Sequence, residues 1–536
     1  MDFTQIWREY QKGLEYMTNV NLFSRVSTCH DFVNGDQWKG LRYSGERPPR
    51  LNILFPMMKS STAMVGQNAL TIEYTSMNYG PARPRLLKIC DLLNQNARML
   101  WEQMKLDKVM WDILQDAYIA GDSFLYFYDD AASHKGRILC EQIDTTNIML
   151  ADERQPDIQK QPYILIVRRM PVDTVRQMAI SNGLGPQEEE GIMPDDDAGA
   201  AAGPRGRTGD KTTVVARLWK ENGNVHIMRV CKTMVLQPDT EIPGLSLYPL
   251  AKYSWKPRKG LARGDGDVWD KIPNQISINK SLYRLEQAVK SASYPIKVYR
   301  QNAISPASVA RLSRPGASIA LQGSGDMPLS NIISYLSPAA ISPYAVTFWQ
   351  DLIKLTRDLS GTGDNLENLN PEQASGVAIQ AVMEAKNLNV NMQLAAYRQF
   401  AEDIAAIWFD MMTVYNPSGL AVTNRAPDEN GSYVTVIPTQ ALKELDVYIK
   451  IDALPTGATL RAAKDDRLKE MLEKGLITFA EYVQALSQDS SMPVETFRKI
   501  VAQRRRTYGR EPEEDSLGEM PPETENENLI PFVPMG

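Results

Sequence analysis

The chain has 536 residues, of which 43% are hydrophobic and 23% charged, and its formal net charge is −6. That length exceeds what one core usually organises, so roughly two to four subdomains are expected. An acidic chain argues against a protein that grips nucleic acid over its whole surface, because phosphate neutralisation needs clustered Lys and Arg. The acidic charge does not exclude a protein that lets nucleic acid slide past it without tight binding.

The sequence predicts neither a membrane span nor a signal peptide. No apolar run reaches the roughly 18 residues that a span needs. Met1–Gln5 do not begin a basic segment followed by an apolar one. The four cysteines are far apart and form no CxxC pair, so reduced thiols in a cytosolic setting are expected.

The first half alternates predicted helices and strands. A helix over 4–27 is followed by an Asn34–Gly35 turn signal and the large anchor Trp38. Period and composition then predict helices near 56–66, 83–106, 108–120 and 171–181, and strands near 70–74, 124–128, 137–142 and 163–168.

Residues 184–212 differ in kind, because they contain almost no large apolar side chain. We expect an exposed, flexible insertion. Its Asp195–Asp197 triplet could bind a cation, but a solvated charge run is the better interpretation, since nothing nearby fixes ligand geometry.

Extended structure is predicted again at 212–219, 225–230 and 249–255, with a hairpin at 221–224. Residues 256–266 form the strongest basic cluster, with Lys256, Arg258, Lys259 and Arg263 among glycines. A phosphate-contacting loop is one interpretation. A mobile hinge is favoured, because the glycines fit no dinucleotide or P-loop fingerprint.

The stretch 343–415 organises the rest of the chain. It predicts a helix over 343–359, a polar loop over 360–369 and a long helix from Asn370 to Tyr415, with a possible bend at Ser375–Gly376. One apolar stripe runs along the long helix in alternating steps of four and three. Its members are Val390, Leu394, Tyr397, Ala401, Ile404, Trp408, Met411 and Tyr415. This pattern fits either a core helix beside a surface loop or a helix pair that presents the loop to a partner.

The flanking segments complete the pattern. A helix is expected over 267–291 and a compact β-containing element over 294–338. Strands near 432–438 and 447–451 precede helices over 459–475, 478–487 and 493–508. The acidic, Pro-rich tail from 511 should be disordered, but it ends in an apolar group formed by Leu529, Ile530, Phe532 and Val533.

The search for catalytic chemistry gives no constellation above background. The sequence contains no P-loop, no HExxH, no Cys/His cluster with zinc spacing and no GxSxG elbow. Its three histidines, His30, His134 and His226, are isolated, so structural or surface roles are expected. The prediction is therefore no enzyme, no cofactor and no metal site.

The order of several short motifs resembles the portal proteins of tailed bacteriophages, the head-to-tail connectors. Residues 32–38 resemble that family's GDQW-type segment, and 50–54 the stretch after it. Residues 116–123 resemble its helix-to-strand passage, and 359–363 with 373–378 its tunnel loop and kinked helix.

The resemblance implies an α+β, helix-rich protomer with a wing, a stem, a clip, a long kinked helix and a crown. The implied domains are listed in chain order. They are wing 1–263 with the insertion 184–212, stem helix 264–293, clip 294–342, second stem helix 343–359, tunnel loop 360–370, long helix with wing strands 371–455, crown 456–510 and disordered tail 511–536.

The function that the resemblance implies is a structural ring, usually dodecameric, at one capsid vertex of the virion. Double-stranded DNA would pass through it during genome packaging and ejection, after assembly in the host cytoplasm. Implied partners are other copies of the chain, the large terminase, the major capsid protein and a head–tail adaptor. Two alternatives remain at this stage, another adaptor or minor head protein and a metal-dependent nucleic-acid enzyme.

Three groups of residues are candidates for functional or structural roles. The polar loop should project into the channel with Ser360, Thr362, Asp364, Asn365 and Asn368. The long helix should bury Leu394, Tyr397, Ile404 and Trp408. The tail could dock through Leu529, Ile530, Phe532 and Val533.

Overall fold

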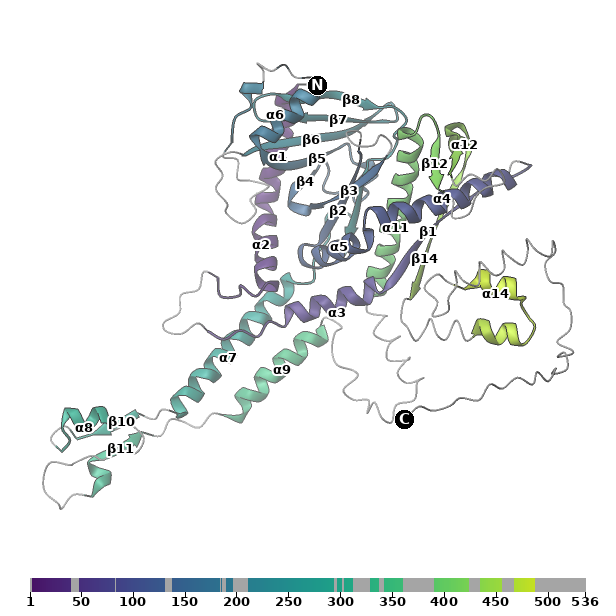
Figure 1. Cartoon of the computed structure of the whole chain (residues 1–536). Coiled ribbons are helices and arrows are strands. Elements are labelled where there is room, and N and C mark those ends of the chain that lie inside the picture. The colour runs from purple at the N-terminus through teal and green to yellow at the C-terminus, as the bar shows by residue number, and fades with distance from the viewer. Residues whose placement is uncertain are drawn as a thin grey trace, which may run out of the picture. The chain divides into compact units, whose positions relative to one another are not determined.

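The computed structural model, shown in Figure 1, has both helices and sheets, which confirms the α+β class. The described residues are 2–39, 48–81, 83–130, 137–183, 185, 189–195, 211–293, 296–300, 303–311, 328–336, 342–359, 390–423, 434–455 and 467–486. The chain divides into two compact units, Met1–Leu454 and Pro455–Gly536.

A five-stranded antiparallel sheet lies in the first unit. Its order is β4 (Ile148–Leu150), β5 (Tyr163–Pro171), β6 (Lys211–Glu221), β7 (Asn224–Val230) and β8 (Val235–Ile242). The neighbours Val214 and Val215 on β6 enter separate apolar clusters, because successive strand side chains point to opposite faces. Helix α1 (Phe3–Asn19) covers one face, and α6 (Val172–Ser181) packs with the Val214 cluster.

The N-terminal helix is interrupted, which corrects the single helix expected over 4–27. Helix α1 ends at Asn19, and α2 spans Leu22–Val33. Between them, Asn21 adopts a left-handed conformation with φ 55°. Asn tolerates this region better than most residues, so the chain turns here without a glycine.

The largest core surrounds a three-stranded sheet with the order β3 (Ile138–Asp144), β2 (Asp122–Asp129) and β9 (Leu250–Ser254). Four helices line much of this core. They are α3 (Leu54–Gly66), α4 (Arg83–Gln103), α5 (Leu106–Ala120) and α11 (Asn391–Tyr415). Strand β1 (Asn68–Ser76) pairs with β14 (Val447–Pro455), and β12 (Leu420–Thr423) pairs with β13 (Val434–Ile437). The short α12 (Thr439–Glu444) lies between β13 and β14 in the chain.

Helices α7 (Ile272–Ser293) and α9 (Pro343–Leu359) lie side by side (Figure 1). The chain between them contains α8 (Pro306–Arg311) and an antiparallel pair, β10 (Ile296–Tyr299) and β11 (Ile333–Leu336). A small core at the start of this helix pair contains Ile53, Met57 and Ile278.

The second unit is described over 467–486. Residues 467–473 are helical, and α14 (Phe479–Ala485) begins with a capping box between Thr478 and Glu481. The two short helices share a core of Tyr482, Val483 and Leu486.

Trp408 is the largest fully buried side chain of the first unit's core, with 0% exposure. Its ring meets the edges of Phe127 and Trp101, with centroids 6.1 and 6.5 Å away. Tyr397 and Ile404 are also buried on α11, and Leu394 is half-buried. One face of α11 therefore fills the space beside the three-stranded sheet.

Replacing Trp408 by Ala should destabilise the chain by about 3–5 kcal/mol, because it leaves a cavity between two aromatic rings. Calorimetric or denaturant unfolding measures the change. The exposed Glu402 on the same helix provides the control, since Glu402→Ala should leave the stability nearly unchanged. Equal melting temperatures for Trp408→Ala and the wild type would contradict the packing described.

Candidate functional site

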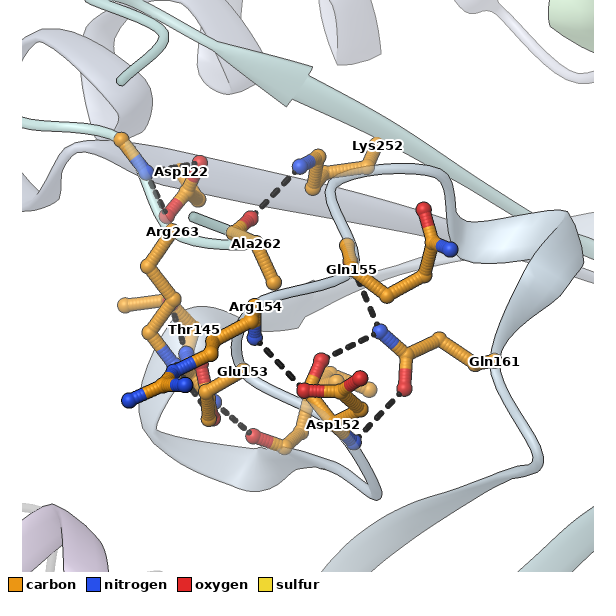
Figure 2. Close-up of polar contacts among 12 residues, drawn as sticks. Asp122, Thr145, Asp152, Glu153, Arg154, Gln155, Gln161, Lys252, Ala262 and Arg263 are labelled. Carbon is orange, nitrogen blue, oxygen red and sulfur yellow. Dashed lines mark hydrogen bonds and ion pairs between the residues drawn. The ribbon is translucent and has the colours of Figure 1, made fainter. Parts of the chain in front are cut away.

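The basic, Gly-rich stretch 256–266 is tied into a polar cluster. Figure 2 shows Arg263 directed at Glu153 and Thr145. Its Nε donates to both Glu153 oxygens at 3.0 and 3.1 Å, and its Nη2 donates to the Ile148 carbonyl at 2.7 Å. Its Nη1 donates to both the carbonyl and the hydroxyl of Thr145. Arg263 is only 7% exposed, and its guanidinium donates its hydrogen bonds to groups inside the fold. It is therefore not available to bind a phosphate.

Two glycines of this stretch, Gly264 and Gly266, serve close packing. Asp122, 1% exposed, accepts hydrogen bonds from the Gly264 amide. A Cβ at Gly264 would lie 2.9 Å from the Lys256 carbonyl oxygen, and one at Gly266 would lie 2.6 Å from that of Ile119. The mobile-hinge interpretation is therefore wrong. The glycines let three backbone segments touch, which requires the absence of a side chain.

Two further cations of the cluster, Lys256 and Arg258, have acidic partners. Lys256 forms an ion pair with Asp267, and Arg258 lies 3.3 Å from Asp265. Lys271 also binds Asp267, at 2.6 Å. The positive charge that the sequence displays is thus largely balanced within the fold.

Asp195 is buried, which corrects its assignment to a solvated charge run. It is 7% exposed, and its carboxylate accepts hydrogen bonds from the Thr213 amide at 2.7 Å and the Thr213 hydroxyl at 3.1 Å. The Arg169 guanidinium lies 3.7 Å away. Asp195 therefore holds the start of β6, and Asp196 and Asp197 lie outside the described residues.

The histidines have structural surroundings where they are described. His226 stacks on Trp219 and its Nδ1 lies 2.9 Å from Asp239. His30 Nε2 lies 3.7 Å from Asp116. His134 lies outside the described residues, as do all five named residues of the polar loop and the four apolar residues of the tail.

Within the described part of the chain, no group of three or more His, Cys, Asp or Glu side chains is arranged to hold a metal ion. None of the helices described there has the length and apolarity that a membrane crossing needs. The most extensive polar arrangements instead join secondary-structure elements, and one of them lies where α7 leaves the body of the first unit.

Comparison with known families gives a match to the Phage P22-like portal protein family over residues 210–529. The chain belongs to this family. A search of curated proteins found no match.

The match includes the helix pair α7–α9, helix α11 and the chain between them. Portal proteins of this family are structural rather than enzymatic. The resemblance seen in the short motifs is thus confirmed, and the portal role is supported by a match to more than half of the chain.

Sequence reasoning missed two amides in this portal chain, Gln275 and Asn279. They are buried on α7, one turn apart, on the face that also carries Ile272 and Ile278. An amide pair at i, i+4 among apolar positions is the signal that could have found them, because buried polar groups need partners.

Asp116 on α5 has a side chain that is only 13% exposed, and its ion-pair partner among the described residues is His30. Burial, together with the smaller effect of the nearby Asp144 and Asp122, raises the pKa of Asp116 to about 7. Ser123 and Gln142 lower it through hydrogen bonds. Burial also lowers the pKa of His30, against the opposing charge of Asp144 and Asp31.

The contribution of Asp116 to folding stability should therefore decrease as the pH rises from about 4 to about 7. In this range the folded chain keeps the Asp116 proton that the unfolded chain releases, so the unfolded state binds fewer protons. Asp116→Asn should remove this dependence. As the pH rises, the free energy of unfolding of the variant should increase relative to that of the wild type, by an amount on the order of a few kcal/mol.

Melting temperatures from pH 4 to 8 test this prediction. Asp112→Asn is the matched control, since Asp112 lies exposed on the same helix. A difference between Asp116→Asn and wild type that stays constant with pH would contradict it.

Proposed function

We propose that the chain assembles into the ring-shaped portal at one vertex of a tailed-phage capsid. The resemblance implies a dodecamer and a channel for double-stranded DNA during packaging and ejection. Membership of the portal family supports this role. It is favoured over both alternatives considered from the sequence, the adaptor and the metal-dependent enzyme.

One apolar stripe on α9 carries the assembly argument. Tyr344, Phe348, Leu355 and Leu359 are 84%, 60%, 60% and 76% exposed. Their spacing of four, seven and four residues places them on one helix face. Contiguous exposed apolar side chains of this kind mark protein–protein contacts.

The same helix is already anchored to its own subunit by a different face. Trp349, Leu352 and Ile353 pack in the small core with α7 and α3. The exposed stripe is therefore left for another chain. A closed ring needs head-to-tail contacts between two different faces of each subunit, and this stripe would supply one of them.

The passive character of the proposed conduit follows from charge. A channel that bound phosphates tightly would hold the duplex, since every neutralised phosphate adds to counterion release. The chain is acidic, and Lys256, Arg258 and Arg263 of its strongest basic cluster bind carboxylates of the same chain. Energy for translocation would come from a separate terminase ATPase, docking on the 294–342 element.

The polar loop 360–370 would line the channel between α9 and the long helix, and the apolar end of the tail would dock on another virion protein or subunit. Both remain proposals about segments outside the described residues. The loop rests on its position between two helices, and the tail on four apolar side chains that follow a solvated segment.

The assembly proposal is tested by mass measurement in solution. The wild-type chain should form a large symmetric ring, and Leu355→Glu should prevent it, because a carboxylate would be buried without a partner. Gln350→Glu puts the same group on another exposed position of α9 and should leave the ring intact.

The protomer itself should tolerate both changes, so circular dichroism and melting temperature serve as folding controls. A wild-type chain that stays monomeric at high concentration would overturn the ring. A Leu355→Glu chain that assembles normally would remove the stripe from the interface.

A further inference from the structure

Helix α7 is held at one end. Its buried residues, Ile272, Gln275, Ile278 and Asn279, all lie within the first eight of its 22 positions. Beyond Asn279 its described side chains are half-buried or exposed. The direction of the whole helix therefore depends on contacts in its first two turns.

Two of those four buried side chains are amides that bind the backbone of residues 51–53. Gln275 Oε1 accepts from the Ile53 amide at 3.1 Å, and its Nε2 donates to the Leu51 carbonyl at 2.7 Å. Asn279 Oδ1 accepts from the Leu51 amide at 3.1 Å and from Gln275 Nε2 at 3.1 Å. Gln275 is 0% and Asn279 2% exposed, so water does not compete for these bonds.

The same segment is fastened on its other side to the end of α2. Asn52 Nδ2 donates to the Val33 carbonyl at 2.8 Å, Trp38 Nε1 donates to the Pro49 carbonyl at 3.2 Å, and the Arg50 guanidinium donates to the Gly35 carbonyl. These contacts come from the GDQW-type segment that the sequence singled out.

Gln37 completes the connection. Asn279 Nδ2 donates to Gln37 Oε1 at 2.6 Å, and Gln37 Nε2 donates to the Phe32 carbonyl at 2.9 Å. We call Gln37, residues 49–53, Gln275 and Asn279 the joint. It links the first turns of α7 to the end of α2 by hydrogen bonds at each step.

Hydrogen bonds and apolar contacts constrain a helix differently. Apolar burial is non-directional, whereas a hydrogen bond weakens steeply as its angle departs from linear. Ile278 packs against Ile53, Met57 and α9, which favours contact but permits sliding. The amides add an angular constraint.

The angle matters because α7 is long. The 14 residues beyond Asn279 extend about 21 Å at 1.5 Å per residue, so a tilt of about 10° at the joint moves the far end of α7 by about 4 Å. A displacement of that size would also move the segment between α7 and α9, which contains β10, α8 and β11.

We propose that Gln275 and Asn279 are positioning residues that fix the direction of α7 relative to the body of its own subunit. The geometry belongs to a single chain, so the direction is set before any assembly. Its importance for ring closure rests on the proposed portal function, but the joint itself does not.

The test measures the direction of α7 in the full chain. Nitroxide labels at Ala63→Cys on α3 and Ser291→Cys on α7, both exposed positions, report the distance by pulsed electron paramagnetic resonance. The half-buried Cys140 is replaced by Ser, and the other three native cysteines are 1–2% exposed. Dilution with unlabelled chain leaves one labelled subunit in each assembly.

Asn279→Leu keeps an apolar side chain of similar size but removes the hydrogen bonds. Ser291 lies 12 residues, about 18 Å, beyond Asn279, so we expect the distance distribution to shift or broaden by about 3 Å, the displacement for a tilt of about 10°. Ile278→Ala removes neighbouring apolar packing and keeps both amides. It should lower the melting temperature while the distribution stays as narrow as in the wild type.

Two results would overturn the proposal. One is an Asn279→Leu distribution as narrow and centred as that of the wild type. The other is equal broadening in Ile278→Ala, which would mean that packing alone sets the direction. Gln275→Leu replaces Asn279→Leu if that variant does not fold. Failure of ring formation would leave this measurement valid, so the two proposals fail separately.

Discussion

The packing of α11 against the three-stranded sheet is the contact on which the first unit depends. Trp408 lies at its centre, between an aromatic ring from β2 and one from α4. Tyr397 and Phe400 meet Tyr253 of β9 a few turns away. Segments that are about 280 residues or more apart in sequence, such as Phe127 and Trp408, thus share one core. An apolar stripe on one helix closes the fold around a sheet built mainly from the first half of the chain.

Directional polar contacts act at the edges of that core. The Arg263–Glu153 pair joins two loops that carry no regular secondary structure, and the Asp122–Gly264 bonds join one of these loops to the start of β2. The joint does the same for residues 51–53, where the Leu51 and Ile53 amides donate to the side chains of Asn279 and Gln275. Buried backbone groups must be satisfied, so a loop that passes through the interior is matched by amide or charged side chains. In the joint that requirement also orients α7.

The periodic elements could be predicted from sequence because their signal is local. The stripe of α11 repeats in steps of four and three, and β6 and β7 read as strands on each side of an Asn–Gly turn. The break at Asn21 was missed because apolar positions continue on both sides of it, although Thr18, Asn19 and Val20 are weak helix formers and Asn21 tolerates the left-handed conformation. Strand β8 was missed because Pro238, Asp239 and Glu241 make it polar, as suits a sheet edge.

The interpretation of charged residues depended on partners that a sequence does not display. Arg263 and Glu153 are 110 positions apart. Read alone, the first suggests a phosphate contact and the second a surface acid, but together they form an internal pair. The same reasoning corrects the interpretation of Asp195 as a solvated charge, because its partner Arg169 lies on β5. The net charge therefore indicates only which classes of function are less expected, and single charged residues of the sequence did not identify a site.

The apolar stripe of α9 shows the complementary situation. A helix in a single subunit needs one buried face, and α9 has that face in Trp349, Leu352 and Ile353. A second apolar stripe on the same helix packs against no core of the described part of the subunit. Its exposure to water is unfavourable and lowers the solubility of the isolated subunit. Its four large side chains are more than half exposed beside a helix whose direction is fixed by hydrogen bonds. An exposed apolar surface held at a defined angle is what a closed ring requires, because each subunit must meet its neighbour at the same rotation for the last contact to form. The joint and the stripe thus serve the same ring contact. The joint fixes the direction of α7, and α9, which packs beside α7, carries the stripe toward the neighbouring subunit at that angle.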